Sequence, residues 1–346
     1  MQEKPFLAGL LPWEIDNLFK KVLDNPVPKF RSRQVCKWIN SGVTGFDGMK
    51  NLPLPLREEL EKKTAVFSSM ITAELNDSDG TKKIQLTLDD GVKIEAVILN
   101  DGYDRKTACI STQAGCPCAC VFCKTGAIGF KRNLTGREMA EQMLFLLGFD
   151  PDISNIVIMG MGEPLLNLDE LRKATAFFTD SEGLGISKKR ITVSTAGIVQ
   201  GIYSLADNGP DVRLAVSLTS ARQEIRDKLM PPAKTNPLPA LKQSLLYYQK
   251  KTKRRITLEA VLLKGCNTDE AEADAFAQFA DNLDVMINLI PWNPVEGFTP
   301  LGIELNSPPI IEINRFMESL SRRKLNVTLR MGKGRRIGGA CGQLGQ

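Results

Sequence analysis

Three cysteines with short, regular spacing are the residues in this chain best suited to chemistry. Cys116, Cys120 and Cys123 form a C-x3-C-x2-C pattern. Three thiolates on one loop can hold three irons of a four-iron cluster and leave the fourth iron open to an outside ligand. The alternatives are a zinc site, which needs four ligands, and a chance cluster of packing cysteines. Cys118 lies too close to its neighbours to be a good fourth ligand, so the pattern favours an open iron–sulfur cluster.

The composition excludes the commonest kinds of catalytic site. The chain has no histidine, so general bases, nucleophile pairs and metal sites that depend on imidazole are all excluded. It has eight cysteines in 346 residues, five of which are crowded between positions 109 and 123. In a reducing compartment such crowding indicates metal or redox chemistry rather than disulfides.

Glycine and polar residues at predicted strand ends form a second set of candidates. Gly160-Met-Gly-Glu-Pro164 follows a strand; there Gly162 would let the backbone approach a ligand, and Glu163 offers an acceptor to an ammonium group. An ordinary strand-to-helix turn is the alternative. Other predicted strand ends carry Ser194, Ser217-Leu218-Thr219 and Asn293. Each of these could simply cap a loop or form a turn, but all occupy equivalent positions.

The first 100 residues have the pattern of a small helical module followed by a β meander. Apolar residues with helical spacing predict helices over 11–24, 31–41 and 57–64. Alternation with a period of two predicts strands over 71–75, 83–88 and 92–99, joined by Asp-Gly turns.

From about residue 102 onward, strands and helices alternate. Strands are predicted over 106–111, 155–159, 190–194, 213–218, 255–263 and 285–291. Helices are predicted over 135–148, 168–179, 198–207, 237–251, 268–281 and 308–322, and Thr135 and Glu138 form a capping box. Six alternations predict an α/β fold, a parallel sheet curled into a full or partial barrel. Such sheets place their chemistry at the carboxyl ends of the strands.

Charge and hydropathy indicate where the protein acts and on what. No apolar stretch approaches the roughly 20 residues of a membrane span, and the N-terminus lacks the pattern of a signal peptide, so we expect a cytoplasmic protein. The net charge is +5. Basic residues gather at 250–255 and at 322–336, which favours a polyanionic partner, although a solvated basic surface is an equal alternative.

The cysteine spacing resembles that of radical SAM enzymes, and longer motifs narrow the resemblance to the RlmN and Cfr family of adenosine methyltransferases. It covers almost the whole chain from about residue 30. The motifs are Gln34-Val-Cys-Lys-Trp38, Cys109-Ile-Ser-Thr-Gln-Ala-Gly-Cys116, Lys131-Arg-Asn-Leu134, Ser187-Lys-Lys-Arg-Ile-Thr-Val-Ser194, Glu224-Ile-Arg-Asp227, Asn288-Leu-Ile-Pro-Trp-Asn-Pro294 and Gly339-Ala-Cys341-Gly-Gln-Leu344.

The resemblance implies a fold and its divisions. It implies a partial (β/α)6-type radical SAM barrel with a small N-terminal helical accessory domain and a β meander. The divisions that we expect are an RNA-binding helical domain over 1–68, the meander over 69–101, the radical SAM core over 102–336 and a tail over 337–346. Arg31, Arg33, Lys37 and Trp38 would belong to the RNA-binding surface, although Trp38 could be a core anchor.

The resemblance also implies cofactors and roles. Cys116, Cys120 and Cys123 would hold a [4Fe-4S] cluster, and two S-adenosylmethionine molecules would be used per turnover. Contacts to S-adenosylmethionine would come from Gly162, Glu163, Ser194, Ser217, Leu218, Thr219 and Asn293. An external one-electron reductant of the flavodoxin or ferredoxin type would be needed, and we expect a monomer.

Two further cysteines carry the reaction in this family. By resemblance, Cys341 would accept a methyl group and pass it, as a methylene radical, to an adenine ring carbon. Cys109 would then remove the ring proton, and the adduct would resolve through a disulfide between the two cysteines. Glu95 matches a glutamate that the family uses as a proton acceptor; the alternative is a strand carboxylate that faces solvent.

The implied substrate is an adenosine of 23S rRNA and, for some members, of tRNA, methylated at carbon 2. Alternatives are methylation at carbon 8 as in Cfr, a radical SAM enzyme with a substrate other than RNA, and a non-catalytic iron–sulfur protein that binds RNA or assists ribosome assembly. Two positions depart from the family. Thr219 stands where histidine is usual, and the loop over 332–337 carries arginines where aspartates are common.

Overall fold

A single main sheet runs through the computed structural model, which describes residues 4–100, 105–295 and 305–345. Within these residues the sheet has ten strands in the order β1-β2-β3-β4-β7-β8-β9-β10-β11-β12. The parallel part consists of β4 (Lys106–Cys109), β7 (Ile153–Ile158), β8 (Ile191–Thr195), β9 (Arg213–Ser217), β10 (Ile256–Leu262), β11 (Val285–Pro291) and β12 (Val327–Leu329). β4 pairs with β3 on one side and with β7 on the other. The parallel strands therefore do not close into a complete barrel. The predicted partial barrel is confirmed, with β12 as an additional strand.

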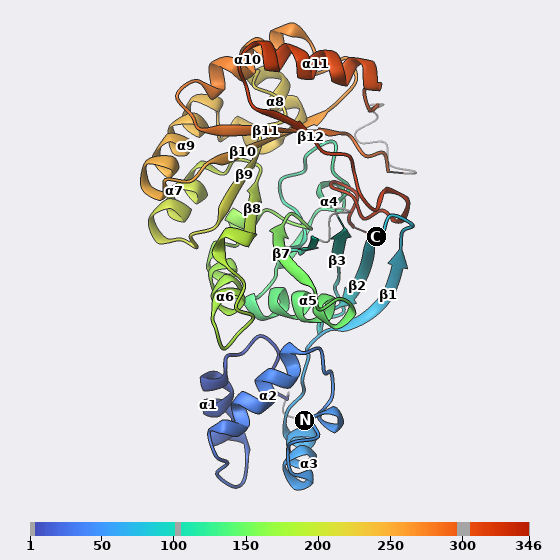
Figure 1. Ribbon diagram of the computed structural model, residues 1–346, viewed down its shortest axis with the longest axis vertical. Coiled ribbons are helices and arrows are strands. Elements are labelled where there is room, and N and C mark those ends of the chain that lie inside the picture. The colour runs from blue at the N-terminus through green and yellow to red at the C-terminus, as the bar shows by residue number, and fades with distance from the viewer. Residues whose placement is uncertain (1–3, 101–104, 296–304, 346) are drawn as a thin grey trace.

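Helices connect the parallel strands and cover the outside of the sheet (Figure 1). They are α5 (Gly136–Phe149), α6 (Leu168–Thr179), α7 (Val199–Asn208), α8 (Gln223–Leu229), α9 (Leu238–Thr252), α10 (Glu270–Ala280) and α11 (Ile310–Arg322). Their apolar residues face the sheet at helical spacing; α11, for example, buries Ile313, Phe316 and Leu320. The predicted capping box at Thr135 and Glu138 begins α5.

The meander extends the barrel sheet instead of standing apart from it. Its strands β1 (Met70–Asn76), β2 (Lys82–Thr87) and β3 (Lys93–Asn100) are antiparallel, and β3 also pairs with β4. Lys83 lies opposite Val97, and Val97 lies opposite Cys109. Residues directly opposite in antiparallel strands point to the same face. The meander therefore presents one face on the same side as Cys109.

The N-terminal helices form a separate layer beside α5 and α6 (Figure 1). They are α1 (Pro12–Val22), α2 (Phe30–Asn40) and α3 (Leu54–Lys63). The chain leaves this layer through Ser68 and Ser69, whose backbone N–H groups and hydroxyls all donate to the buried Glu141 carboxylate of α5. This carboxylate fixes the start of the meander. The expected boundary between meander and core, at 101–102, lies outside the described residues.

A small hairpin beside the main sheet carries the cysteine loop. It consists of β5 (Gln113–Gly115) and β6 (Phe130–Asn133), with the short helix α4 (Lys124–Ala127) between them. The hairpin strands and β12 are three or four residues long, too short to show a period in the sequence. In the part of the chain that the structure describes, no helix has the length and apolar character needed to cross a membrane.

Candidate active site

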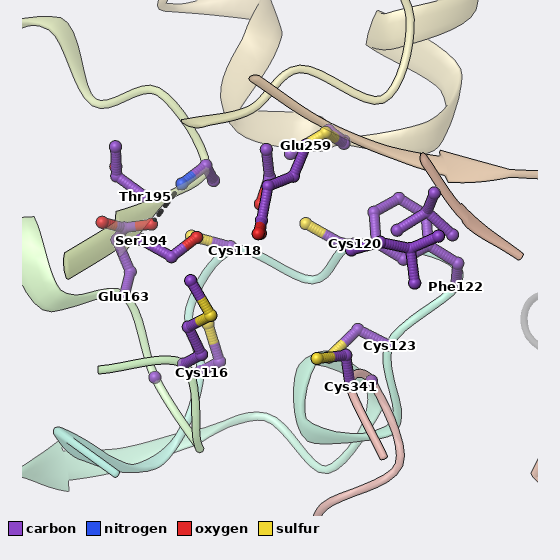
Figure 2. A pocket seen from close by; sticks show the side chains of 18 of the residues that line it. Cys116, Cys118, Cys120, Phe122, Cys123, Glu163, Ser194, Thr195, Glu259 and Cys341 are labelled. Carbon is purple, nitrogen blue, oxygen red and sulfur yellow. Dashed lines mark hydrogen bonds between the residues drawn. The ribbon is translucent and has the colours of Figure 1, made fainter. Parts of the chain in front are cut away.

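A cavity opens where the carboxyl ends of β7 to β11 meet the cysteine loop and the C-terminal tail (Figure 2). Its space of ≈ 910 Å³ includes a part that is open to solvent. Nine of the predicted site residues line it: Cys116, Cys120, Cys123, Gly162, Glu163, Ser194, Ser217, Asn293 and Cys341. Cys118 also lines it.

The hairpin and its neighbours fix the cysteine loop. The Cys116 N–H donates to the Gly129 carbonyl (3.0 Å), which closes the loop. A Cβ on Gly115 would lie 1.7 Å from the same carbonyl oxygen, so only glycine fits there. The Trp292 indole donates to the Phe122 carbonyl (3.0 Å) from the end of β11. Contacts from both sides thus hold the thiols at the cavity wall.

The thiols suit an iron–sulfur cluster better than a single ion. Among the described residues no three Cys, Asp or Glu side chains converge closely enough to hold one metal ion. A four-iron cluster takes one thiolate for each iron and so accepts more widely separated thiols. Burial raises the pKa of Cys120 and Cys123, whereas a hydrogen bond from Cys118 lowers the pKa of Cys116.

The glycine-rich segment after β7 brings Glu163 into the cavity. Gly162 has a φ of +106°, and a Cβ there would lie 2.6 Å from the Gln113 Cβ; both features require glycine. Glu163 is buried and accepts hydrogen bonds from the backbone N–H groups of Leu165 (3.0 Å) and Ala196 (2.7 Å). Burial raises the pKa of Glu163, and these two hydrogen bonds lower it in part. Each carboxylate oxygen can accept further hydrogen bonds, so Glu163 can still receive an ammonium group.

The predicted residues at the end of β9 occupy different places. Ser217 lines the cavity, but Leu218 and Thr219 are fully buried and are not among the lining residues. Thr219 has a φ of +59°, which is rare for a β-branched residue. Its N–H donates to the Glu259 carbonyl (3.0 Å), and its hydroxyl has no hydrogen-bond partner in the part of the chain that the structure describes. Thr219 therefore shapes the strand end from behind the cavity.

Sequence reasoning missed Glu259 and the role of Arg226. Glu259 lies on β10 and lines the cavity; burial raises its pKa. Arg226 is fully buried, and its guanidinium donates to the carbonyls of Ala196 (2.6 Å) and Ser217 (2.8 Å) at the ends of β8 and β9. A carboxylate inside the apolar strand Ile256–Leu262 is a signal that could have identified Glu259.

Asn293 links the wall of the cavity to the C-terminal tail. It is 2% exposed, and its Nδ2 donates to the Cys341 carbonyl (3.1 Å). Its Oδ1 is buried and has no hydrogen-bond partner among the described residues. A buried acceptor without a partner is costly. This oxygen lies against Gly332, where an added Cβ would come within 2.3 Å of it.

A second, smaller cavity joins Cys109 to Cys341. Both residues line it, together with Arg330 and Lys333, and it shares Met159, Ile290, Asn293 and Cys341 with the larger cavity. Both cysteines are free thiols. Burial raises the pKa of Cys109 to about 12 and also raises the pKa of Cys341, while the nearby Arg330 guanidinium opposes both shifts.

Glu95 lies apart from both cavities. It is 2% exposed, so the solvent-facing alternative is wrong. Its Oε1 pairs with the Lys83 ammonium (3.0 Å), and its Oε2 accepts the Gly345 N–H (2.7 Å). Neither cavity includes Glu95 among its described lining residues.

The loop over 332–337 docks on the turn between β1 and β2. The Gly334 N–H donates to Asp79 (2.9 Å), and the Arg336 side chain donates to Ser78 (2.8 Å). Asp77 accepts the Arg336 N–H (3.3 Å). Two aspartates of the meander thus accept hydrogen bonds from the backbone of this arginine-bearing loop.

Comparisons with known proteins agree with this architecture. A family model described as the radical SAM superfamily matches residues 110–277. A second, described as the ribosomal RNA large subunit methyltransferase N-terminal domain, matches residues 3–66. A solved structure, a radical SAM methyltransferase from Sphaerobacter thermophilus, has a TM-score of 0.91 and 33% sequence identity, with 99% of each chain covered.

Relatives match along nearly their whole length. A protein from Treponema denticola is 47% identical over 342 residues, which cover 99% of this chain and 96% of the relative. One from Thermus thermophilus is 39% identical over 346 residues, with 99% and 93% covered. Both are named probable dual-specificity RNA methyltransferase RlmN.

Proposed function

We propose that this chain, which belongs to the RlmN family of radical SAM RNA methyltransferases, methylates carbon 2 of an adenosine in 23S rRNA and also acts on tRNA. The observation that supports the two-cysteine part of the proposal is a pair of cavities that share wall residues. One is lined by Cys116, Cys120 and Cys123, the other by Cys109, and both by Cys341. A group carried on Cys341 can therefore face either chemistry.

The larger cavity fits the cofactors that the family implies. Cys116, Cys120 and Cys123 would hold a [4Fe-4S] cluster, which supplies the electron that cleaves S-adenosylmethionine when both are bound. Glu163 would receive the ammonium group, and the Asn293 Oδ1 would accept a second donor. Ser194 and Ser217 supply hydroxyls on the same wall. We infer that two S-adenosylmethionine molecules are used per turnover and that an external flavodoxin or ferredoxin supplies the electron.

The smaller cavity fits the two-cysteine part of the scheme. Cys341 would accept the methyl group and present it to the adenine, and Cys109 would remove the ring proton before the two cysteines form a disulfide. Because burial raises the pKa of Cys109 to about 12, it carries a proton at neutral pH. The positive charge of Arg330 favours the thiolate that proton removal requires.

Basic residues near the two cavities and on the N-terminal helices support an RNA partner. Lys333 lines the smaller cavity, and Lys37 is exposed on α2. In contrast, the basic run at 250–255 is largely neutralised, because Lys251, Arg254 and Arg255 each pair with an aspartate. RNA phosphates would bind the cations, and the target base would leave its stack to reach Cys341. Residues 1–68 would act as the RNA-binding domain, 69–101 as the meander, 102–336 as the catalytic core and 337–346 as the tail.

Nucleoside mass spectrometry tests the proposal. 23S rRNA and tRNA are isolated from a bacterial host that lacks its own enzyme, with and without this protein. We expect 2-methyladenosine only when the protein is present, and the RNA fraction that contains it identifies the target. If only 8-methyladenosine forms, carbon 8 replaces carbon 2. If neither forms, while the purified protein does not cleave S-adenosylmethionine, a non-catalytic RNA-binding role replaces the enzyme.

A further inference from the structure

The C-terminal tail is fastened at points on both sides of Cys341. Before the cysteine, the Gly338 carbonyl accepts from the Lys83 ammonium (3.2 Å). After it, the Gly345 N–H donates to the Glu95 carboxylate (2.7 Å). The two contacts come from neighbouring meander strands, β2 and β3. Figure 1 shows the tail running alongside the meander, with the C-terminus next to it.

The two meander residues form one buried ion pair. Lys83 and Glu95 are 3.0 Å apart, and their side chains are 2% and 3% exposed. Burying such a pair costs desolvation energy that the attraction between the charges often fails to repay. The pair is therefore weak as a device for stability alone. Each charge has a second hydrogen-bond partner, and both partners belong to the tail backbone.

The strand register places this pair on the same face as a catalytic thiol. Lys83 lies opposite Val97, which lies opposite Cys109, and Glu95 is two residues from Val97. Lys83, Glu95 and Cys109 therefore share a face of the sheet. This face forms a wall of the smaller cavity through Leu99 and Cys109. The position of the tail is thus set relative to Cys109 by residues of the adjoining strands β2 and β3.

We propose that the buried Lys83–Glu95 ion pair is a clamp that holds the tail on the meander and so sets the position of Cys341. Lys83 and Glu95 are positioning residues that act through Cys341. One carboxylate oxygen of Glu95 pairs with Lys83 and the other accepts the Gly345 N–H. Glu95 is not among the described residues that line either cavity. The reaction in which Cys341 is used rests on the proposed function, but the clamp is tested without it.

The test measures how fast Cys341 reacts with iodoacetamide in the cluster-loaded protein, by mass spectrometry of its peptide and with Cys266 as internal reference. In Lys83→Met we expect the relative rate at Cys341 to rise by about tenfold or more, the factor that one hydrogen bond to a charged group supplies. The matched control is Lys82→Met. Lys82 is next to Lys83 in β2 but pairs with Glu74 on the neighbouring strand β1. The alkylation rate of Cys341 in Lys82→Met should therefore stay at the wild-type value.

Two further variants separate positioning from general damage. Lys83→Arg keeps the charge and the donors, so it should restore the slow alkylation of Cys341. Glu95→Gln keeps an oxygen for Gly345 but removes the charge that faces Lys83, so the rate should rise by a smaller factor, about threefold. This variant tests the clamp even if Lys83→Met does not fold.

The clamp and the proposed function fail in different ways. If Glu95→Gln and Lys83→Met leave the alkylation rate of Cys341 at the wild-type value, the clamp is wrong, whatever happens to activity. If the rates rise as expected while the wild-type protein methylates no RNA, the clamp stands and the proposed function fails.

Discussion

The two cysteine-bearing walls of the site are held in different ways. The cluster wall, which carries Cys116, Cys120 and Cys123, is held by residues close to it in sequence. Cys116 follows β5 directly, and the hairpin that closes its loop ends within 20 residues. The tail wall is remote: Cys341 is fixed through hydrogen bonds that span 255, 250 and 219 residues, from Lys83, Glu95 and Thr125. Contacts between residues close in sequence place the three cluster cysteines, which have one role. Contacts between residues far apart in sequence place Cys341, which must serve two steps. The tail wall also contacts the cysteine loop, because the Lys124 N–H donates to the Gly342 carbonyl (2.8 Å).

The largest effect should come from removing the thiol of the tail wall. Cys341→Ala is expected to lower methylation by about a thousandfold or more, since no group remains to carry the methyl. The cluster wall does not use this side chain, so iron and sulfide content should match those of the wild type. RNA methylation and metal analysis measure both. Methylated adenosine formed at the wild-type rate would refute the two-cysteine scheme.

A change behind the cluster wall should lower stability as well as activity. Arg226→Met leaves the buried carbonyls of Ala196 and Ser217 without donors, which should lower the free energy of unfolding by about 3 kcal/mol. Urea denaturation measures this loss. Arg213, which is exposed at the start of β9, offers the control: Arg213→Met should change stability by less than about 0.5 kcal/mol. Equal effects of the two variants would contradict the role of Arg226.

Cys109, on β4, lines the smaller cavity with the tail and should show its burial in a pH profile. The pKa of Cys109 is raised to about 12 by burial, so the thiolate fraction increases about tenfold for each pH unit below that value. Alkylation of Cys109 should therefore keep accelerating from pH 7 to pH 10. A profile that levels off near the ordinary thiol pKa would show that the neighbouring Arg330 outweighs burial.

The smallest effect should come from the edge of the tail. Asp79→Asn weakens the hydrogen bond from the Gly334 N–H but leaves the Lys83–Glu95 pair in place. The alkylation rate of Cys341 should rise by about threefold or less, because one neutral hydrogen bond replaces a charge-assisted one. An increase as large as that of Lys83→Met would move the main anchor of the tail from the ion pair to the loop over 332–337.

The sequence was informative where structure is local. The C-x3-C-x2-C spacing, the glycines around Glu163 and the strand-end serines all identify the cluster wall, because residues that follow parallel strands meet at one edge of the sheet. Lys83, within β2, could not be assigned in this way. A charged residue within a strand is ambiguous until the register shows which face it occupies. Thr219 shows the converse, since its position at a strand end does not bring its side chain into the cavity.

The most direct test of the two-cysteine site is mass spectrometry of Cys109→Ala after reaction with RNA, S-adenosylmethionine and a reductant. Without a thiol to remove the ring proton and form the disulfide, the Cys341 adduct should persist, and a covalent protein–RNA species should accumulate while free methylated RNA is absent. Free methylated RNA at the wild-type rate, without such an adduct, would contradict the assignment of Cys109 and Cys341 to one reaction.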